Sequence, residues 1–247
     1  MYNFIRRWAN LVESENEVRE PGRRDVLCFF DGAWHDSEGN RIEISSREER
    51  NVVETISRIE SKNYSSMPSL VMMDDAETLE DIADYLECDI EDVFLFFRYP
   101  RSQLSEFRSP SSEDPELSGG IYFLASLQEY DGNGTVRWTE IADISGNFES
   151  TSIFSMLMRR FFLWLKKNGV KVVASNCRTK TSDRFFGSWV FLRRFEEYGY
   201  VKLGDIDRTE EIDGETFRLN VLVDEKWWEK LSPDEKEEVV DLISTYL

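Results

Sequence analysis

The sequence predicts an α/β (α+β) protein with a mixed, mostly antiparallel sheet flanked by helices. Two long segments of strand-forming residues, 121–130 and 135–144, flank the turn sequence DGNG, which is typical of a β-hairpin. A strongly apolar helical segment then leads to the strand-like run VKVVAS. Because a helix between two strands returns the chain to the same end of a sheet, segments 135–144 and 170–175 should form one parallel pair.

The first hundred residues predict an amphipathic helix followed by an α/β extension of the main sheet. Residues 1–20 place apolar side chains at helical spacing up to a break at Pro21-Gly22. The extension, residues 21–100, begins with a predicted β-hairpin over 25–44, in which AWHDSEGN is the turning region.

Further helices are predicted within this extension. Ser45 or Ser46 can cap the first, whose apolar face is formed by Val52, Val53, Ile56 and Ile59. Residues 70–73 predict a short strand, and residues 75–97 carry two helical patterns with a break near 87–89. Their spacing matches a helix-turn-helix. Acidic residues would repel phosphate, however, and the run FLFF indicates a core segment, not contacts with a DNA groove.

Two segments flank the predicted core of residues 120–223. Residues 101–119 predict a flexible linker or a long surface loop, because SPSSEDPELSGG lacks an apolar period. Residues 224–247 predict a helical tail in which Ser232-Pro233 starts a new helix. Inside the core, a buried helix ends at Asn168-Gly169 and a later helix ends at Gly199. The runs YVKLGDI and ETFRLNVLV predict two further strands.

Composition limits the classes of function. The 247 residues include 30 Lys and Arg and 49 Asp and Glu, so the formal net charge is −19. This charge argues against a protein that coats nucleic acid or an anionic membrane. No apolar run predicts a membrane-spanning helix or a secretory signal, so a cytoplasmic location is expected. Three widely spaced Cys and one His, His35, argue against a disulfide framework, a metal site and a Ser-His-Asp triad.

The charge is unevenly distributed along the chain. Residues 151–202 hold eleven Lys and Arg and three Asp and Glu, a net charge of +8, which leaves −27 for the remainder. This basic block could bind an anion such as a phosphorylated cofactor or, locally, a nucleic-acid backbone. The alternative is that its basic side chains pair with the acidic remainder of the protein.

Residues 120–223 resemble the GNAT (N-acetyltransferase) superfamily. TEIADIS resembles the family's fourth strand, and SIFSMLMRRFFLWLKKNGVKVVAS its cofactor-binding helix and fifth strand. FLRRFEEYGYVKLG resembles a later helix of the family that ends in an aromatic-x-x-x-Gly-aromatic pattern, and ETFRLNVLV resembles the last strand. The resemblance implies that acyl-CoA lies between the fourth and fifth strands, with its pyrophosphate on amides at the N-terminus of the helix. It also implies that a substrate amine attacks the thioester directly, helped by a carboxylate base and often by a tyrosine acid.

The motif of the family's phosphate loop is degenerate here. Its basic or Gln position and its two small-residue positions hold Glu149, Ser152 and Phe154. The family's tyrosine position, four residues before Gly199, holds Phe195, which cannot donate a proton. Tyr198 lies directly before Gly199. A shifted loop within SGNFESTS could supply another anion-binding turn.

The resemblance and the strand pattern together predict the site residues. Glu140 is the candidate base and Tyr198 the candidate acid; Glu140 should share one face of its strand with Trp138 and Ala142, opposite Ile141 and Asp143. The candidate cofactor-binding residues are Ile144, Gly146, Ser150, Thr151, Ser152, Asn176, Arg178 and Lys180. The alternatives are an exposed strand acid at 140, N-capping at 150–152 and a solvated loop at 176–180.

Two functions are compatible with these features. The first is an acyl-CoA-dependent N-acyltransferase that uses acetyl-CoA or another acyl-CoA and acts on an unidentified amine. The second is a non-catalytic GNAT-like acidic binding protein that engages a basic partner, such as a phage-encoded inhibitor or a virion-associated protein. The first residues resemble the capsid-targeting peptides of tailed-phage head proteins, with a cut expected after Glu13. A phage origin would place the protein in the host cytoplasm or the virion.

Overall fold

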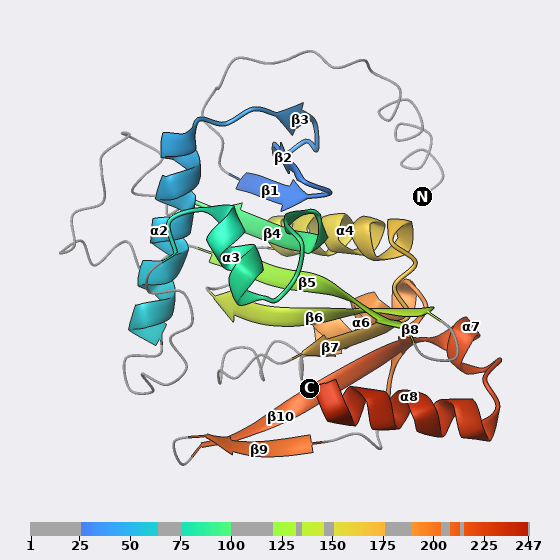
Figure 1. Ribbon diagram of the computed structural model, residues 1–247. Coiled ribbons are helices and arrows are strands. Elements are labelled where there is room, and N and C mark those ends of the chain that lie inside the picture. The colour runs from blue at the N-terminus through green and yellow to red at the C-terminus, as the bar shows by residue number, and fades with distance from the viewer. Residues whose placement is uncertain are drawn as a thin grey trace, which may run out of the picture.

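A single ten-stranded mixed sheet organises the protein. The computed structural model describes residues 26–63, 76–99, 121–131, 135–145, 151–175, 189–203, 208–212 and 215–246. The strand order is β3-β2-β1-β4-β5-β6-β7-β10-β8, and β9 pairs with β10 (Figure 1). All pairs of described strands are antiparallel except β6 with β7. The strands are β1 Val26–Phe30, β2 Ala33–His35, β3 Arg41–Ile42, β4 Val93–Arg98, β5 Ile121–Asp131, β6 Thr135–Ser145, β7 Val172–Ser175, β8 Tyr200–Lys202, β9 Arg208–Ile212 and β10 Glu215–Asp224.

Helices cover both faces of this sheet. On one face, α2 (Ser46–Asn63) and α3 (Leu79–Tyr85) pack over β1, β4 and β5, and α8 (Pro233–Tyr246) packs over β10 (Figure 1). On the other face lie α4 (Thr151–Lys167) and α6 (Trp189–Glu197). The short helices η2 (Ile90–Asp92) and α7 (Glu225–Trp228) precede β4 and follow β10. The predicted class, a mostly antiparallel mixed sheet flanked by helices, is confirmed.

The central prediction of topology is also confirmed. β5 and β6 form the predicted long hairpin, and β6 and β7 are parallel, with α4 as the crossover between them. Helix α4 is apolar around most of its circumference because most of its side chains are buried. Its inner side packs against Phe94, Phe123 and Val173 of three strands, and Phe162 packs against Phe195 of α6. Gly169, with φ of +65°, ends the helix as expected.

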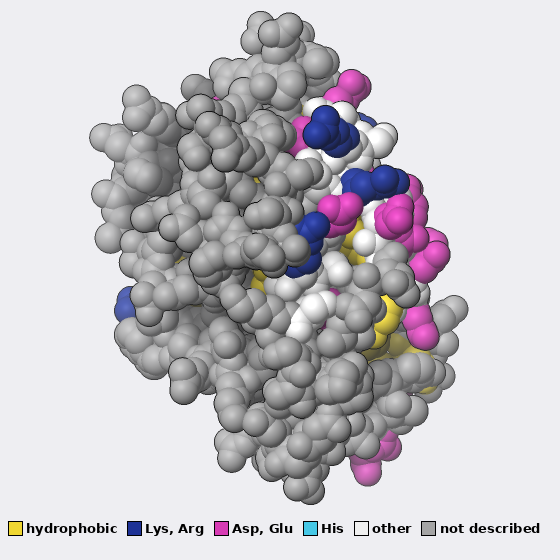
Figure 2. All heavy atoms as spheres, turned by 90° about the vertical axis from the view of Figure 1, so that its left-hand side faces the viewer, with side chains coloured by type: hydrophobic (Ala, Val, Ile, Leu, Met, Phe, Trp, Pro, Cys, Tyr) yellow, Lys and Arg dark blue, Asp and Glu magenta, His cyan; other side chains and the backbone are white. Residues whose placement is uncertain are grey.

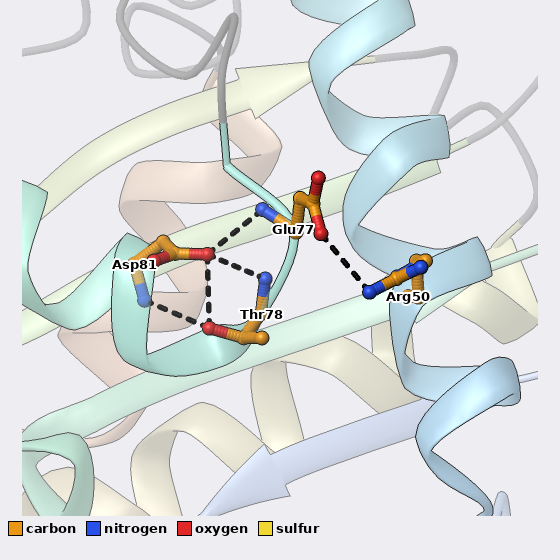
Figure 3. Close-up of polar contacts among 4 residues, drawn as sticks. All are labelled: Arg50, Glu77, Thr78 and Asp81. Atoms are coloured by element: carbon orange, nitrogen blue, oxygen red, sulfur yellow. Dashed lines mark hydrogen bonds and ion pairs between the residues drawn. The ribbon is translucent and has the colours of Figure 1, made fainter.

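Local capping sets the ends of the helices on the opposite face. The Ser45 hydroxyl accepts the N–H of Glu48 at 3.2 Å, and Val52, Val53, Ile56 and Ile59 are buried as predicted. At α3, Thr78 and Asp81 form a capping box, in which each side chain accepts the other residue's backbone N–H (Figure 3). An ion pair of 3.0 Å between Arg50 and Glu77 links this turn to α2 (Figure 3).

Two predictions in the N-terminal extension are wrong. The second helical pattern of residues 75–97 is instead η2 followed by β4, a central strand with five consecutive buried residues from Val93 to Phe97. A short apolar run suits a strand covered on both faces as well as it suits a buried helix. The predicted turning region contains β2, because Asp31 and Gly32 have φ of 52° and 65° and reverse the chain at once. Residues 26–42 therefore form three strands, not one hairpin.

The remaining predicted elements have mixed outcomes. Strand β9 is absent from the prediction, whereas β8, β10 and the break before α8 form as expected. The predicted helix at 1–20, the strand at 70–73 and the linker at 101–119 lie outside the described residues. None of the helices in the described ranges combines the length and apolar character that crossing a membrane requires.

Candidate functional site

The parallel strands β6 and β7 pair over only four residues. The register runs from Trp138 opposite Val172 to Ile141 opposite Ser175. Beyond Ile141, β6 continues to Ser145, and in the described part of the chain these last residues pair with β5 alone. Among the described residues, no strand therefore pairs with the β7 side of β6 beyond Ile141, at the edge where α4 begins. Ligands of mixed and parallel sheets characteristically bind at such carboxyl ends of strands.

A β-bulge lies at the same point of β6. Ala125 pairs with Ile141, but Leu124 pairs with Asp143, so Ala142 is the extra residue. A bulge bends its strand and increases the local twist. The predicted alternation of faces holds for Trp138, Glu140 and Ile141, and the bulge interrupts it before Asp143.

Glu140 lies one residue before the end of the β6–β7 pairing. It is half-buried, and it is opposite Ala174 on β7 and opposite Ser126 on β5. Its face is the one covered by α2, α3 and α8. Ala142 belongs to the apolar cluster under α2 and α3, Trp138 packs against the cluster under α8, and Glu140 lies between these two residues along β6. Glu140 is thus a carboxyl group at the seam between two apolar clusters.

Tyr198 lies on the opposite side of the sheet. Its ring stacks on Phe162 of α4, with centroids 4.0 Å apart and an interplanar angle of 10°. Phe162 belongs to the core cluster that includes Ile141 and Val173, on the face that Glu140 does not occupy. The structure therefore does not bring Tyr198 and Glu140 together. Phe195, at the family's tyrosine position, is fully buried against Phe162.

The predicted cofactor-binding residues are only partly described. Ile144 pairs with Phe123 through its backbone, and Thr151 and Ser152 begin α4. Gly146, Ser150, Asn176, Arg178 and Lys180 lie outside the described residues. Phe154, at a small-residue position of the family's loop, is buried in the core, so its ring points away from solvent.

Several members of the basic block have structural partners. Lys167 pairs with Asp31 at 2.6 Å and Lys171 with Asp224 at 3.5 Å. Arg193 and Arg194 both pair with Glu197. Arg160 donates a hydrogen bond to the Ser37 carbonyl oxygen at 3.3 Å. Lys167 and Lys171 thus pair with the acidic remainder of the protein, as the alternative states, whereas Arg193 and Arg194 pair within the block and Arg160 binds a backbone oxygen.

The described thiols and the single imidazole do not resemble catalytic groups. Burial raises the pKa of Cys28 and that of Cys88 to about 12, so both remain protonated thiols at neutral pH. Burial lowers the pKa of His35 to about 4, and its ring stacks on Phe30 with centroids 3.8 Å apart.

The sequence alone does not predict that two polar residues lie near Glu140. Ser126 and Gln128 lie on β5, the strand that pairs with the Glu140 strand. Strand alternation along β6 identifies Glu140, but only the register between β5 and β6 places these two residues beside it.

The surface over α2 is mixed in charge. Figure 2 shows the side of the molecule on which α2 lies in Figure 1, and basic and acidic side chains are interspersed over its described part. Arg58 pairs with Glu54 there at 3.6 Å. A contrasting segment comes next in the chain. Residues 76–92, which include α3 and η2, contain eight Asp and Glu and no Lys or Arg.

Comparison with solved structures finds similar chains. No protein-family model matches the chain, and no curated protein matches it. The chain is similar to the crystal structure of the acetyltransferase from Vibrio fischeri, with 13% sequence identity and a TM-score of 0.33. The alignment covers 56% of this chain and 94% of that one. A likeness at this level carries no functional argument, so a functional assignment depends on the strand arrangement and on Glu140.

Proposed function

We propose that this protein is an acyl-CoA-dependent N-acyltransferase in which Glu140 is the general base. One observation carries the proposal: the β6–β7 pairing stops at Ile141 while β6 continues, and Glu140 lies beside that point. This is where the GNAT resemblance puts the acyl donor. An extended donor with amide groups, such as the pantetheine arm of acyl-CoA, suits a strand edge, because it can hydrogen-bond to the backbone of the strand.

The proposed reaction is a direct transfer. The substrate amine gives up a proton to the Glu140 carboxylate, and its nitrogen attacks the thioester carbonyl carbon. A C–N amide bond forms and the C–S bond breaks; the CoA thiolate then takes up a proton from water, and Glu140 releases its proton to water. Glu140 is on a rigid paired strand, which holds the base in one position. Because of its location, Tyr198 has no role in this scheme.

The acyl donor would be held by groups around the start of α4. In this proposal the backbone of Ile144 contacts the pantetheine arm, and Gly146, Ser150, Thr151 and Ser152 receive the pyrophosphate near the helix N-terminus. Asn176, Arg178 and Lys180 follow β7 and complete the binding set. The paired Lys167 and Lys171 are not included, since Asp31 and Asp224 already neutralise them.

A thiol-release assay tests the catalytic role of Glu140. Acetyl-CoA is incubated with the protein and, in turn, spermidine and a lysine-containing peptide, and free CoA thiol is measured. Glu140→Gln should reduce turnover by about 10²-fold or more while acetyl-CoA still binds. Glu129→Gln is the matched control, because Glu129 also lies on the hairpin but is exposed and pairs with Arg137. Equal rates in Glu140→Gln and wild type would refute the assignment.

A second candidate function is a non-catalytic acidic protein that binds a basic partner. The acidic stretch at residues 76–92 favours it, because Glu80, Asp81, Asp84 and Glu87 are all exposed there. Burial first, and then the negative charges of Asp89 and Glu129, raise the pKa of Asp92. Under this alternative the folded protein binds a basic peptide but not acetyl-CoA.

A further inference from the structure

We infer that Trp138 of β6 binds the acceptor, and that the acceptor is an alkylamine with at least two positive charges. The inference rests on the proposed function, because it names the substrate class of the same site. It is supported by the place of Trp138 beside Glu140, by the state of the Trp138 ring and by the acidic end of α3. Trp138 contacts the substrate in this scheme and has no part in proton transfer.

Trp138 and Glu140 lie side by side on one face of β6. They are two positions apart on the strand, so their side chains leave the same face with β-carbons about 7 Å apart. Trp138 packs against the cluster under α8, and both side chains are half-buried, so each keeps contact with solvent. An alkylamine that reaches Glu140 along this face therefore passes over the indole ring.

The indole ring of Trp138 is not engaged by the described part of the protein. Trp34 donates a hydrogen bond to Glu49 at 3.2 Å, and the Lys236 ammonium lies 5.4 Å from the centre of the Trp228 ring. Trp138 makes neither a hydrogen bond nor a ring contact with the described residues. Because the face of an indole ring attracts ammonium groups, Trp138 is suited to hold a cation next to the proposed base.

The end of α3 brings negative charge to the same part of the sheet. Gln128, the register partner of Trp138, donates from Nε2 to the backbone carbonyl oxygen of Leu86 at 3.3 Å. Leu86 follows α3 directly, so this contact fixes the end of the helix over the sheet beside Trp138. Asp84 and Glu87 flank Leu86 and are exposed, and no Lys or Arg among the described residues pairs with either.

These placements define the acceptor by its charges. One amine reaches the Glu140 carboxylate and is acylated, while a second positive group lies between the Trp138 ring and the end of α3. Asp84 and Glu87 are like charges three positions apart, and a bound cation offsets their repulsion. A monoamine leaves that repulsion in place, so the site should prefer an amine with two or more charges.

Calorimetric titration without acetyl-CoA tests this inference, with spermidine and with butylamine, which has a single charge. Wild type should bind spermidine about tenfold more tightly than butylamine. Trp138→Leu should weaken spermidine binding about fivefold. Trp228→Leu is the matched control and should change the affinity less than about twofold, because a cation of the protein already lies over that ring.

Glu87→Gly separates binding from stability. Glu87 has φ of 53°, a left-handed conformation that favours glycine, so the variant should unfold at the same or a higher urea concentration than wild type. Its affinity for spermidine should nevertheless fall about threefold, because one negative charge is lost. This variant serves if Trp138→Leu does not fold.

Equal affinity for spermidine in wild type, Trp138→Leu and Glu87→Gly would overturn the inference, as would equal affinities of wild type for spermidine and butylamine. If the affinities differ as expected but acetyl-CoA does not bind, the cation site stands and the proposed function fails. If both amines are acetylated with the same KM, the inference fails and the proposed function stands.

Discussion

The guanidinium group of Arg160 on α4 occupies the space where a β-carbon on Gly39 would lie. Gly39 has φ of +91° and belongs to the turn between β2 and β3. The same guanidinium donates to the carbonyl oxygen of Ser37, a residue 123 positions earlier in the chain. The Asp36 carboxylate accepts backbone N–H groups from residues 38–40. A preorganised turn is thus fixed to the central helix.

This contact predicts a marked effect of Gly39→Ala. The new methyl group would displace the Arg160 guanidinium from its hydrogen bond to Ser37 and would require a backbone conformation that alanine rarely adopts, so stability should fall by about 2 kcal/mol. Gly169→Ala is the control, because Gly169 also has positive φ but no atom lies within 4 Å of its would-be β-carbon. Urea denaturation should show a smaller loss for Gly169→Ala. Equal losses would mean that the contact with Arg160 contributes nothing.

The buried imidazole of His35 predicts an acid-sensitive stability. Burial lowers its pKa from 6.5 to about 4, so the unfolded chain binds more protons than the folded protein between these values. Stability associated with neutral His35 is therefore fully present above pH 6.5 and is lost as the pH falls toward 4. His35→Phe keeps the aromatic stack on Phe30. It should make the urea midpoint less dependent on pH across this interval. An unchanged pH dependence in His35→Phe would contradict the assignment.

The raised thiol pKa values predict slow alkylation. Burial keeps Cys28 and Cys88 protonated at about pH 8, and a thiol reacts through its thiolate. Iodoacetamide should leave both unmodified in the folded protein, as located by mass spectrometry of its peptides, and should modify both in urea. Rapid modification of Cys28 without denaturant would show that the sheet opens locally.

The position of Tyr198 predicts that it is dispensable for chemistry. Tyr198→Phe keeps the stack on Phe162 and removes only the hydroxyl, which lies on the side of the sheet opposite Glu140. Thiol release from acetyl-CoA should stay within about twofold of wild type, because no proton donor is lost from the reacting centre. If Tyr198→Phe reduced the rate of thiol release as much as Glu140→Gln, Tyr198 would again be the candidate acid.

Local pattern is sufficient to predict much of the fold but not all of it. The helix of residues 151–167 and the hairpin around DGNG have long, strong periodicities, and both form as predicted. The run Val93–Phe97 has no periodicity, and only its place between β1 and β5 makes it a strand. The β2 strand is three residues long, too short for alternation to show.

The site is predictable only in part, for a related reason. Glu140 is proposed from the sequence because the family resemblance and strand alternation both point to it. The bulge at Ala142 and the pairing of Ser126 with Glu140 depend on a register that no single strand encodes. The opposite placement of Tyr198 depends on how α4 and α6 pack, which is a property of the assembled core.

Calorimetric titration of the purified protein with acetyl-CoA and with free CoA, at low and moderate salt, decides whether the protein binds an acyl donor. The proposed function predicts micromolar binding of acetyl-CoA to wild type and to Glu140→Gln alike, because the carboxylate acts on the amine and does not hold the donor. Absence of heat at millimolar acetyl-CoA, with the protein shown to be folded by circular dichroism, would contradict it. The acidic stretch at residues 76–92 and its basic partners would then become the leading explanation.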